Sequence, residues 1–260
     1  MSTTWAIAWR EFRSYFVSPI GYVVLALFLL LTGYFYYSSL IEFVNRSLLF
    51  DQQAGMMSGD APKMNINEWV IRPFFFNLSV ITLFLVPMIT MRLLCEEKKT
   101  GTIELLMTSP VTELQVTLGK FLAGFGLYGV MLLGTLPAMV ISFVYSRPDL
   151  GPILTGYLGL ILIAAACLAL GTLVSSLTEN QIVAGFASFA LLLLLWLVHW
   201  AEDLTPGPTG SVLSYLSVVR HFEDMSKGVL DTRDVIFYLS LIVCGLFATM
   251  RALESGRWRS

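Results

Sequence analysis

The residues of this sequence that could bind a nucleotide are limited to one Gly-Lys pair. A phosphate-binding loop of the form G-x-x-x-x-G-K-[ST] cradles phosphates with its backbone and reaches them with its lysine. In this chain Gly119-Lys120 has Leu114 at the position of the first glycine, so this loop cannot form. We therefore expect that the chain does not hydrolyse ATP by itself and holds no cofactor of its own.

Groups that could serve as a nucleophile, a general base or metal ligands are equally isolated. An intramembrane serine protease would need a nucleophile and a base buried together. The two histidines, His199 and His221, fall at the end of an apolar block and in a polar loop. Cys95, Cys167 and Cys244 are scattered, without the spacing of a disulfide framework or a metal site. The sequence predicts no catalytic residue and no metal site.

The most informative charged segment is residues 91–120, MRLLCEEKKTGTIELLMTSPVTELQVTLGK, in which acidic and basic residues alternate. Within it Thr100-Gly101-Thr102 predicts a break in the helix. Ile103, Leu106 and Met107 then follow the i, i+3, i+4 spacing of an apolar helix face. An apolar face on a polar loop needs a partner.

Two interpretations of this short helix stay open. Ser109-Pro110 predicts its end and the start of a further helix, with Ser109 as N-cap and Pro110 at the first helical position. The region 96–108 would then either dock on another protein or pack on the inner surface of its own chain.

The elements that carry this loop are predicted to be membrane-spanning helices. The chain is 56% hydrophobic and 13% charged, with a mean hydropathy of +0.75, whereas soluble domains carry about 25% charged residues. Its apolar blocks have the length of about 20 residues that a bilayer core of about 30 Å requires. The net charge of −2 excludes a basic surface for nucleic acid. The fold class predicted is an all-α integral membrane protein with six spans, at residues 19–40, 74–94, 119–145, 153–176, 182–200 and 235–252.

An amphipathic helix is predicted before the first span, over residues 1–17. Its aromatic residues recur at helical spacing, and its basic residues lie on the other side; they are Trp5, Trp9, Phe12 and Phe16 against Arg10 and Arg13. Tryptophan favours the headgroup region, so this segment should lie in the membrane interface. Ser18-Pro19 predicts a break before the first span.

Two loops are assigned to the outer side. Residues 41–73 lack an apolar period and are predicted to be mostly irregular, with Asn67 capping a short helix through Trp69 that leads into the second span. Residues 201–234 are too polar to span the membrane and too apolar for a plain linker, which favours one or two short helices at the outer leaflet. An even number of spans, with Arg10, Arg13, Arg257 and Arg259 near the ends, predicts that both termini are cytoplasmic.

The stretch 86–124 resembles the signature region of ABC-2 type permeases, and most closely that of the gliding-motility-associated branch. That branch carries P-x-x-T-M-R, E-E-[RK]-x-x-G-T-x-E-L-L and P-[VL]-[ST]…G-K in this order. The matching residues are Pro87, Thr90, Met91, Arg92, Glu96, Glu97, Gly101, Thr102, Glu104, Leu105, Leu106, Pro110, Gly119 and Lys120. Further likeness in residues 18–35, 175–186 and 221–240 extends it over most of the chain.

This resemblance implies a permease subunit in the bacterial inner membrane that works with a separate ABC ATPase, which binds the ATP and Mg²⁺. The second-to-third-span loop would be the coupling helix, and its contact residues would be Glu96, Glu97, Gly101, Thr102, Ile103, Glu104, Leu105, Leu106 and Met107. A second copy or a paralogous permease would complete the path, with Phe75, Phe76 and Trp196 in regions that could line it or face lipid. Such a complex would export a cargo or transmit force to an extracytoplasmic partner protein.

An ion-gradient-driven secondary transporter is the alternative from another functional class. Such transporters place ionisable residues inside their spans, where charges are costly. The predicted span interiors carry essentially none, and Glu179 falls in a short turn between the fourth and fifth spans. Energy is therefore expected to enter from a partner protein.

Overall fold

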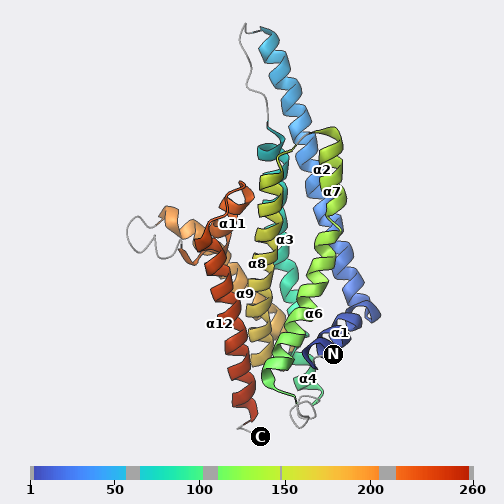
Figure 1. The fold of residues 1–260 in the computed structure, drawn as a ribbon, viewed down its shortest axis with the longest axis vertical. Coiled ribbons are helices and arrows are strands. Elements are labelled where there is room, and N and C mark those ends of the chain that lie inside the picture. Colours follow the sequence, from blue (N-terminus) through green and yellow to red (C-terminus); the bar gives the residue numbers. More distant parts are fainter. Residues whose placement is uncertain (1–2, 57–64, 102–110, 147, 205–214, 258–260) are drawn as a thin grey trace.

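The computed structural model describes residues 3–56, 65–101, 111–146, 148–204 and 215–257, and these form a long bundle of helices (Figure 1). Six helical segments are long and apolar enough to cross a membrane. Both chain ends lie toward one end of the bundle (Figure 1). The predicted all-α, six-span fold class is confirmed.

Each predicted span corresponds to one of these segments. In chain order they are α2 (Pro19–Met56), η1 (Asn67–Ile71) with α3 (Arg72–Thr90), α6 (Glu113–Leu133) with α7 (Leu136–Tyr145), α8 (Leu150–Leu177), α9 (Gln181–Leu204) and α12 (Thr232–Arg257). The apolar windows of α3 and α8 are 72% and 67% buried, against 17% and 22% for α9 and α12. The bundle therefore has α3 and α8 at its centre, and its outer helices keep apolar faces exposed.

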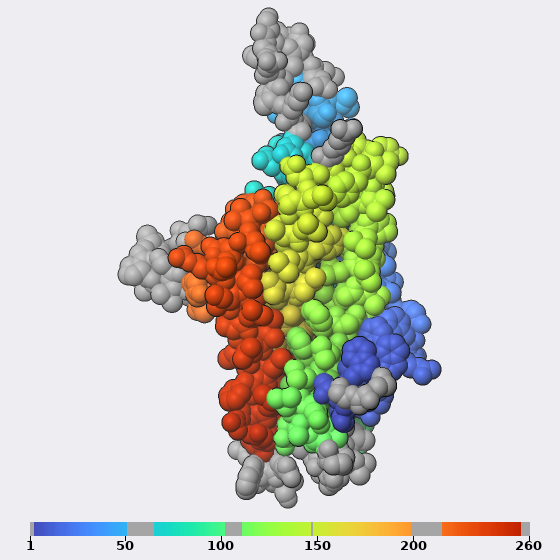
Figure 2. All heavy atoms as spheres, in the orientation of Figure 1, coloured from blue at the N-terminus to red at the C-terminus, as the bar shows by residue number. Residues whose placement is uncertain are grey.

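The segment before the first span is a separate helix, α1 (Thr3–Val17), which lies against the lower part of α6 (Figure 2). The chain turns at Ser18, and Pro19 begins α2. At this corner a Cβ on Gly21 would come within 2.1 Å of the Tyr15 carbonyl oxygen, so only glycine fits. The predicted break at Ser18-Pro19 is present.

The first span departs from the prediction, because α2 continues as a helix to Met56. Its 38 residues correspond to about 57 Å at 1.5 Å per residue, far beyond a hydrocarbon core of about 30 Å. Arg46 stabilises the projecting part through an ion pair to Glu42 at 2.8 Å, and its guanidinium lies 4.7 Å from the Trp69 ring centre. The prediction of an irregular loop was therefore wrong for residues 41–56.

The entry to the second span also differs in detail. η1 begins at Asn67. The backbone N–H of Asn67 donates a hydrogen bond to the side-chain Oδ1 of Asn65 at 2.9 Å, so Asn65 caps the first turn. The Asn67 amide instead donates to Asp149 at 2.8 Å. Asn67 therefore ties η1 to the start of α8, and the capping role predicted for it was wrong.

The third span, predicted as one helix, is divided at Gly134-Thr135 between α6 and α7. Pro137 lacks the N–H that would continue the hydrogen-bond ladder of α6. The Thr135 hydroxyl donates to the Leu132 carbonyl at 2.7 Å and lies 2.8 Å from the Tyr157 hydroxyl of α8. The break is thus fixed to the neighbouring span.

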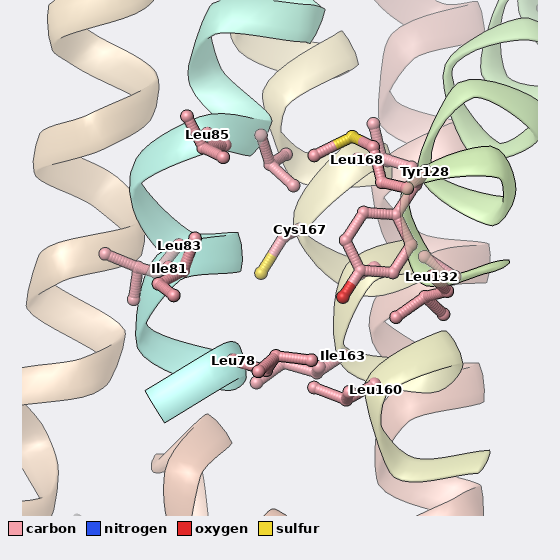
Figure 3. Close-up of a cluster of buried hydrophobic side chains, with 14 of the residues drawn as sticks. Leu78, Ile81, Leu83, Leu85, Tyr128, Leu132, Leu160, Ile163, Cys167 and Leu168 are labelled. Carbon is pink, nitrogen blue, oxygen red and sulfur yellow. The ribbon is translucent and has the colours of Figure 1, made fainter. Parts of the chain in front are cut away.

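The core lies between α3, α6 and α8 (Figure 3). Leucine and isoleucine side chains fill it around Tyr128, whose hydroxyl lies 2.7 Å from that of Thr82. The small residues Gly171 and Ser175, four positions apart on α8, let this helix approach α3 closely, because a Cβ on Gly171 would meet the Thr90 hydroxyl at 2.4 Å. These small residues serve packing within the chain.

The outer segment 201–234 contains the short helix α11 (Val218–Ser226), while residues 205–214 lie outside the described part. Phe222 is fully buried, and its ring would be 2.9 Å from a Cβ on Gly159 of α8. The His221 ring bonds Asp234 of α12 at 2.6 Å. α11 is therefore firmly packed on the bundle, as the mixed composition of this segment suggested.

Candidate functional site

The segment that leads from the second span into the predicted coupling region is the short helix α4 (Cys95–Lys99). A turn at residues 91–94 separates it from α3. It ends at Lys99, and Gly101 two residues later has a φ of +71°, a left-handed conformation that favours glycine. The break predicted around Gly101 is thus present in the backbone.

Four charged residues, which we call the basal cluster, bind α4 to its neighbours: Arg10 and Glu11 of α1, Glu97 of α4 and Lys120 of α6. The Lys120 ammonium lies 2.9 Å from Glu97 Oε1 and 3.5 Å from Glu11 Oε1, and Arg10 lies 3.7 Å from the same Glu97 oxygen. Two positive and two negative charges balance each other.

Three of the charged side chains in the basal cluster are largely removed from water. The side chain of Lys120 is 2% exposed, and those of Glu97 and Glu11 are 15% and 19% exposed. A charge removed from water is costly unless it is paired, so these three groups depend on one another. The cluster therefore joins α1, α4 and α6 into one unit.

The C-terminal end of α8 holds α4 from the other side. The Ser175 hydroxyl accepts from the backbone N–H groups of Leu94 and Cys95, each at 3.2 Å, which satisfies donors at the start of the helix. The Lys98 ammonium donates to the carbonyl of Ser176. Ser175 and Ser176 thus position α4 on the end of α8.

The corner between α1 and α2 makes a third attachment. Arg92 pairs with Glu96 at 3.0 Å and donates to the Ser18 hydroxyl at 3.2 Å. Nearby, the Tyr15 hydroxyl donates to the Ile89 carbonyl at 3.4 Å. Burial raises the pKa of the Tyr15 phenol well above its ordinary value, and the Glu11 carboxylate adds to this rise. Tyr15 is therefore a neutral anchor of α1 on α3.

The far side of the coupling region is fixed at the start of α6. Thr112 and Gln115 form a reciprocal capping box: the Gln115 N–H donates to the Thr112 hydroxyl at 3.3 Å, and the Thr112 N–H to the Gln115 side chain at 3.2 Å. The helix thus begins at Glu113, and the prediction that Ser109-Pro110 caps it was wrong. Those two residues lie outside the described part.

A small apolar cluster joins the two sides of the loop. Leu94 before α4, Val116 of α6 and Leu253 of α12 are buried together, and Ile7 and Val111 pack against them. The residues before and after the loop therefore pack in the same apolar cluster.

The predicted ATPase-contact residues fall into three groups. Glu96 is 45% exposed, while Glu97 belongs to the basal cluster. Gly101 forms the exposed turn after α4. The others lie outside the described residues, and they are Thr102, Ile103, Glu104, Leu105, Leu106 and Met107.

The predicted path-lining residues differ in their burial. Phe75 is fully buried, 5.1 Å from the Tyr157 ring, so it could face a path only if the core opened. Phe76 and Trp196 are half-buried. An apolar groove of about 300 Å³ lies instead further along α3 and α9, and is lined by Phe84, Pro87, Met88, Met91, Ile182, Gly185, Phe186 and Phe189.

Sequence reasoning missed Lys120 as the centre of a site. A lysine inside an apolar block must find a partner, because an unpaired charge there is costly. That rule marks Lys120 as paired, but its partner Glu11 lies on a helix distant in the sequence. Only the packing of α1 on α6 brings the two together.

Six apolar helices that are long enough to cross a membrane indicate a multi-pass membrane protein. The family model described as "ABC-2 family transporter protein" matches residues 5–232. The chain belongs to the ABC-2 transporter family, which implies that an ABC ATPase drives it.

Two curated relatives are similar to this chain. Both are described as "Probable multidrug ABC transporter permease YbhR", from Escherichia coli strain K12 and from Escherichia coli O157:H7. Each is 24% identical over 170 residues, which is 62% of this chain and 44% of the relative. The matched region spans less than half the length of these relatives.

Proposed function

We propose that this chain is the transmembrane permease subunit of an ATP-driven ABC-2 transporter, and that it converts ATP hydrolysis in a separate ATPase into export across the bacterial inner membrane. The observation that carries this proposal is the basal cluster, which attaches both the amphipathic helix α1 and the span α6 to α4. A displacement of the loop after α4 would then be transmitted to several helices at once.

The directions of transmission follow from the attachments of α4. Its backbone connects it to α3 through the turn at 91–94. Ser175 connects it to α8, and Lys120 connects it to α6. Because α3 and α8 are the most buried spans, a displacement of α4 would act on the centre of the bundle.

We propose further that two copies, or this chain and a paralogous permease, face each other across the path. The groove between α3 and α9 supports this arrangement, since Phe84 and Phe186 on its walls are 51% and 72% exposed. Every residue that lines it is apolar or glycine, so the cargo we propose is a hydrophobic or amphipathic compound. The relatives' description as multidrug permeases agrees with such a cargo.

The test is co-expression with the cognate ABC ATPase. We expect a purified complex of two permease and two ATPase chains that hydrolyses ATP, while the permease alone does not. Native mass measurement gives the stoichiometry. An active transport complex that lacks a nucleotide-binding subunit would contradict the proposal and favour the ion-driven alternative.

A further inference from the structure

A second groove lies between α1 and α6, away from the groove between α3 and α9. It has a volume of about 290 Å³, and it is lined by Trp5, Ala8, Trp9 and Phe12 of α1 and by Leu122, Phe125 and Gly126 of α6. Figure 2 shows the face on which α1 lies over α6. The lining offers apolar and aromatic surface only.

The aromatic wall of this groove is ordered and partly open. The rings of Trp5 and Trp9 stack at 6.5 Å, and those of Trp9 and Phe12 at 5.9 Å. Trp5 and Trp9 are nevertheless 50% and 55% exposed. On α6, Gly126 has no side chain to fill the groove, and a Cβ there would come within 3.2 Å of the Phe12 ring. A slender apolar chain could therefore lie along the rings.

The basic residue nearest to this aromatic wall in the sequence of α1 that is free of ion pairs among the described residues is Arg13. Arg13 is exposed and makes no ion pair within the described ranges 3–56, 65–101, 111–146, 148–204 and 215–257. It lies four residues after Trp9, one helical turn further along α1, so it borders the aromatic face on its polar side. Arg10, by contrast, is held by Glu11 and Glu97. Arg13 is thus placed to meet an anion whose apolar part occupies the groove.

We propose that this groove is a binding site for an anionic phospholipid of the membrane in which the chain sits, with an acyl chain along Trp5, Trp9 and Phe12 and the phosphate at Arg13. Charge complementarity and the apolar lining together favour this ligand. The bound lipid would pack α1 onto α6 beside the basal cluster. This inference requires only the membrane location of the chain, and it is independent of the proposed transport cycle.

Tryptophan quenching by brominated phospholipids tests the site directly. The full chain, with Trp69, Trp196, Trp200 and Trp258 replaced by phenylalanine, keeps Trp5 and Trp9 as reporters. It is reconstituted in phosphatidylcholine vesicles containing a small fraction of either brominated phosphatidylglycerol or brominated phosphatidylcholine. We expect phosphatidylglycerol to be preferred about fivefold, which corresponds to about 1 kcal/mol for one basic residue at an anionic surface.

Two variants separate the headgroup from the acyl chain. Arg13→Gln should abolish the preference for phosphatidylglycerol, and Gly126→Leu, which fills the groove, should reduce quenching by both lipids. The control Arg46→Gln, at the opposite end of α2, should change neither. Equal quenching by both lipids in the parent chain, or a preference that survives Arg13→Gln, would mean contact with bulk lipid only and would overturn the proposal.

Discussion

The Lys120 ammonium of α6 lies 2.9 Å from the Glu97 carboxylate of α4, and the lysine side chain is almost completely buried. The family resemblance predicts that Glu97 faces the ATPase, but its side chain points into its own chain. Glu97, one of the residues that match the family motif, therefore positions α4 within its own chain.

Replacing the lysine should destabilise the base of the bundle. Lys120→Met removes the buried cation and leaves the exposed guanidinium of Arg10 beside Glu97 and Glu11, at 3.7 Å and 3.0 Å. Breaking a buried ion pair costs about 3 kcal/mol or more. We expect a clear fall in apparent Tm in detergent, with partial recovery in Lys120→Met combined with Glu97→Gln, because the double variant removes one of the stranded charges.

Lys99→Met is the matched control, because Lys99 is an exposed lysine on α4, the helix that carries Glu97. It should leave the apparent Tm close to that of the parent chain. Equal Tm values for the Lys120 and Lys99 variants would show that the basal cluster contributes no stability.

The membrane-spanning architecture could be predicted because hydropathy reports directly on lipid. The same measure ended the first span at residue 40, since Glu42, Asn45 and Arg46 lower the hydropathy without interrupting the helix. Their i, i+4 ion pair stabilises a helix in water as well as in lipid. Hydropathy marks where the bilayer core ends, and it does not mark where a helix ends.

The candidate site was predictable only in part, because its residues meet through tertiary packing. Gly101 could be placed at a turn from local chemistry alone. The pairing of Lys120 with Glu11 depends on α1 folding back over α6, which no local pattern specifies. Phe75 and Phe76 are neighbours of the same type, but Phe75 is buried because its ring packs against Tyr157 and Gly156 of α8.

The predicted orientation places both termini in the cytoplasm and the projecting end of α2 outside. In a Cys244→Ser background, in which Cys95 and Cys167 are buried, Leu48→Cys should react with a membrane-impermeant maleimide added to right-side-out spheroplasts. Lys99→Cys should react only after the membrane is opened. A reporter enzyme fused at residue 260 should show cytoplasmic activity.

Labelling of Lys99→Cys from outside, together with protection of Leu48→Cys, would invert the orientation. It would also remove the coupling region from the side where ATP is available.

The proposed pairing of two chains predicts cross-linking along α9. In the same Cys244→Ser background, Phe186→Cys on the exposed rim of the α3–α9 groove should give a dimer with a short bis-maleimide in native membranes. Phe247→Cys on α12, which is 52% exposed, is the control that should face lipid. Dimers from Phe247→Cys alone would move the contact between copies to α12.

The last prediction concerns docking of the ATPase by residues 96–107, most of which lie outside the described part of the chain. Burial of a leucine-sized side chain is worth about 1.5 to 3 kcal/mol, whereas an exposed ion pair contributes about 0 to 1 kcal/mol. Leu106→Asp should therefore prevent co-purification of the ATPase while leaving insertion of the six spans intact.

Glu104→Gln should weaken retention of the ATPase only slightly, unless its carboxylate is buried and paired at the contact, where the loss could reach several kcal/mol. Leu48→Asp, the same substitution at an exposed leucine of the projecting part of α2, is the matched control and should retain the ATPase fully. Retention on an affinity column compares the three variants. Full retention by Leu106→Asp would mean that the apolar face of Ile103, Leu106 and Met107 does not bind the ATPase, and would favour packing on its own chain.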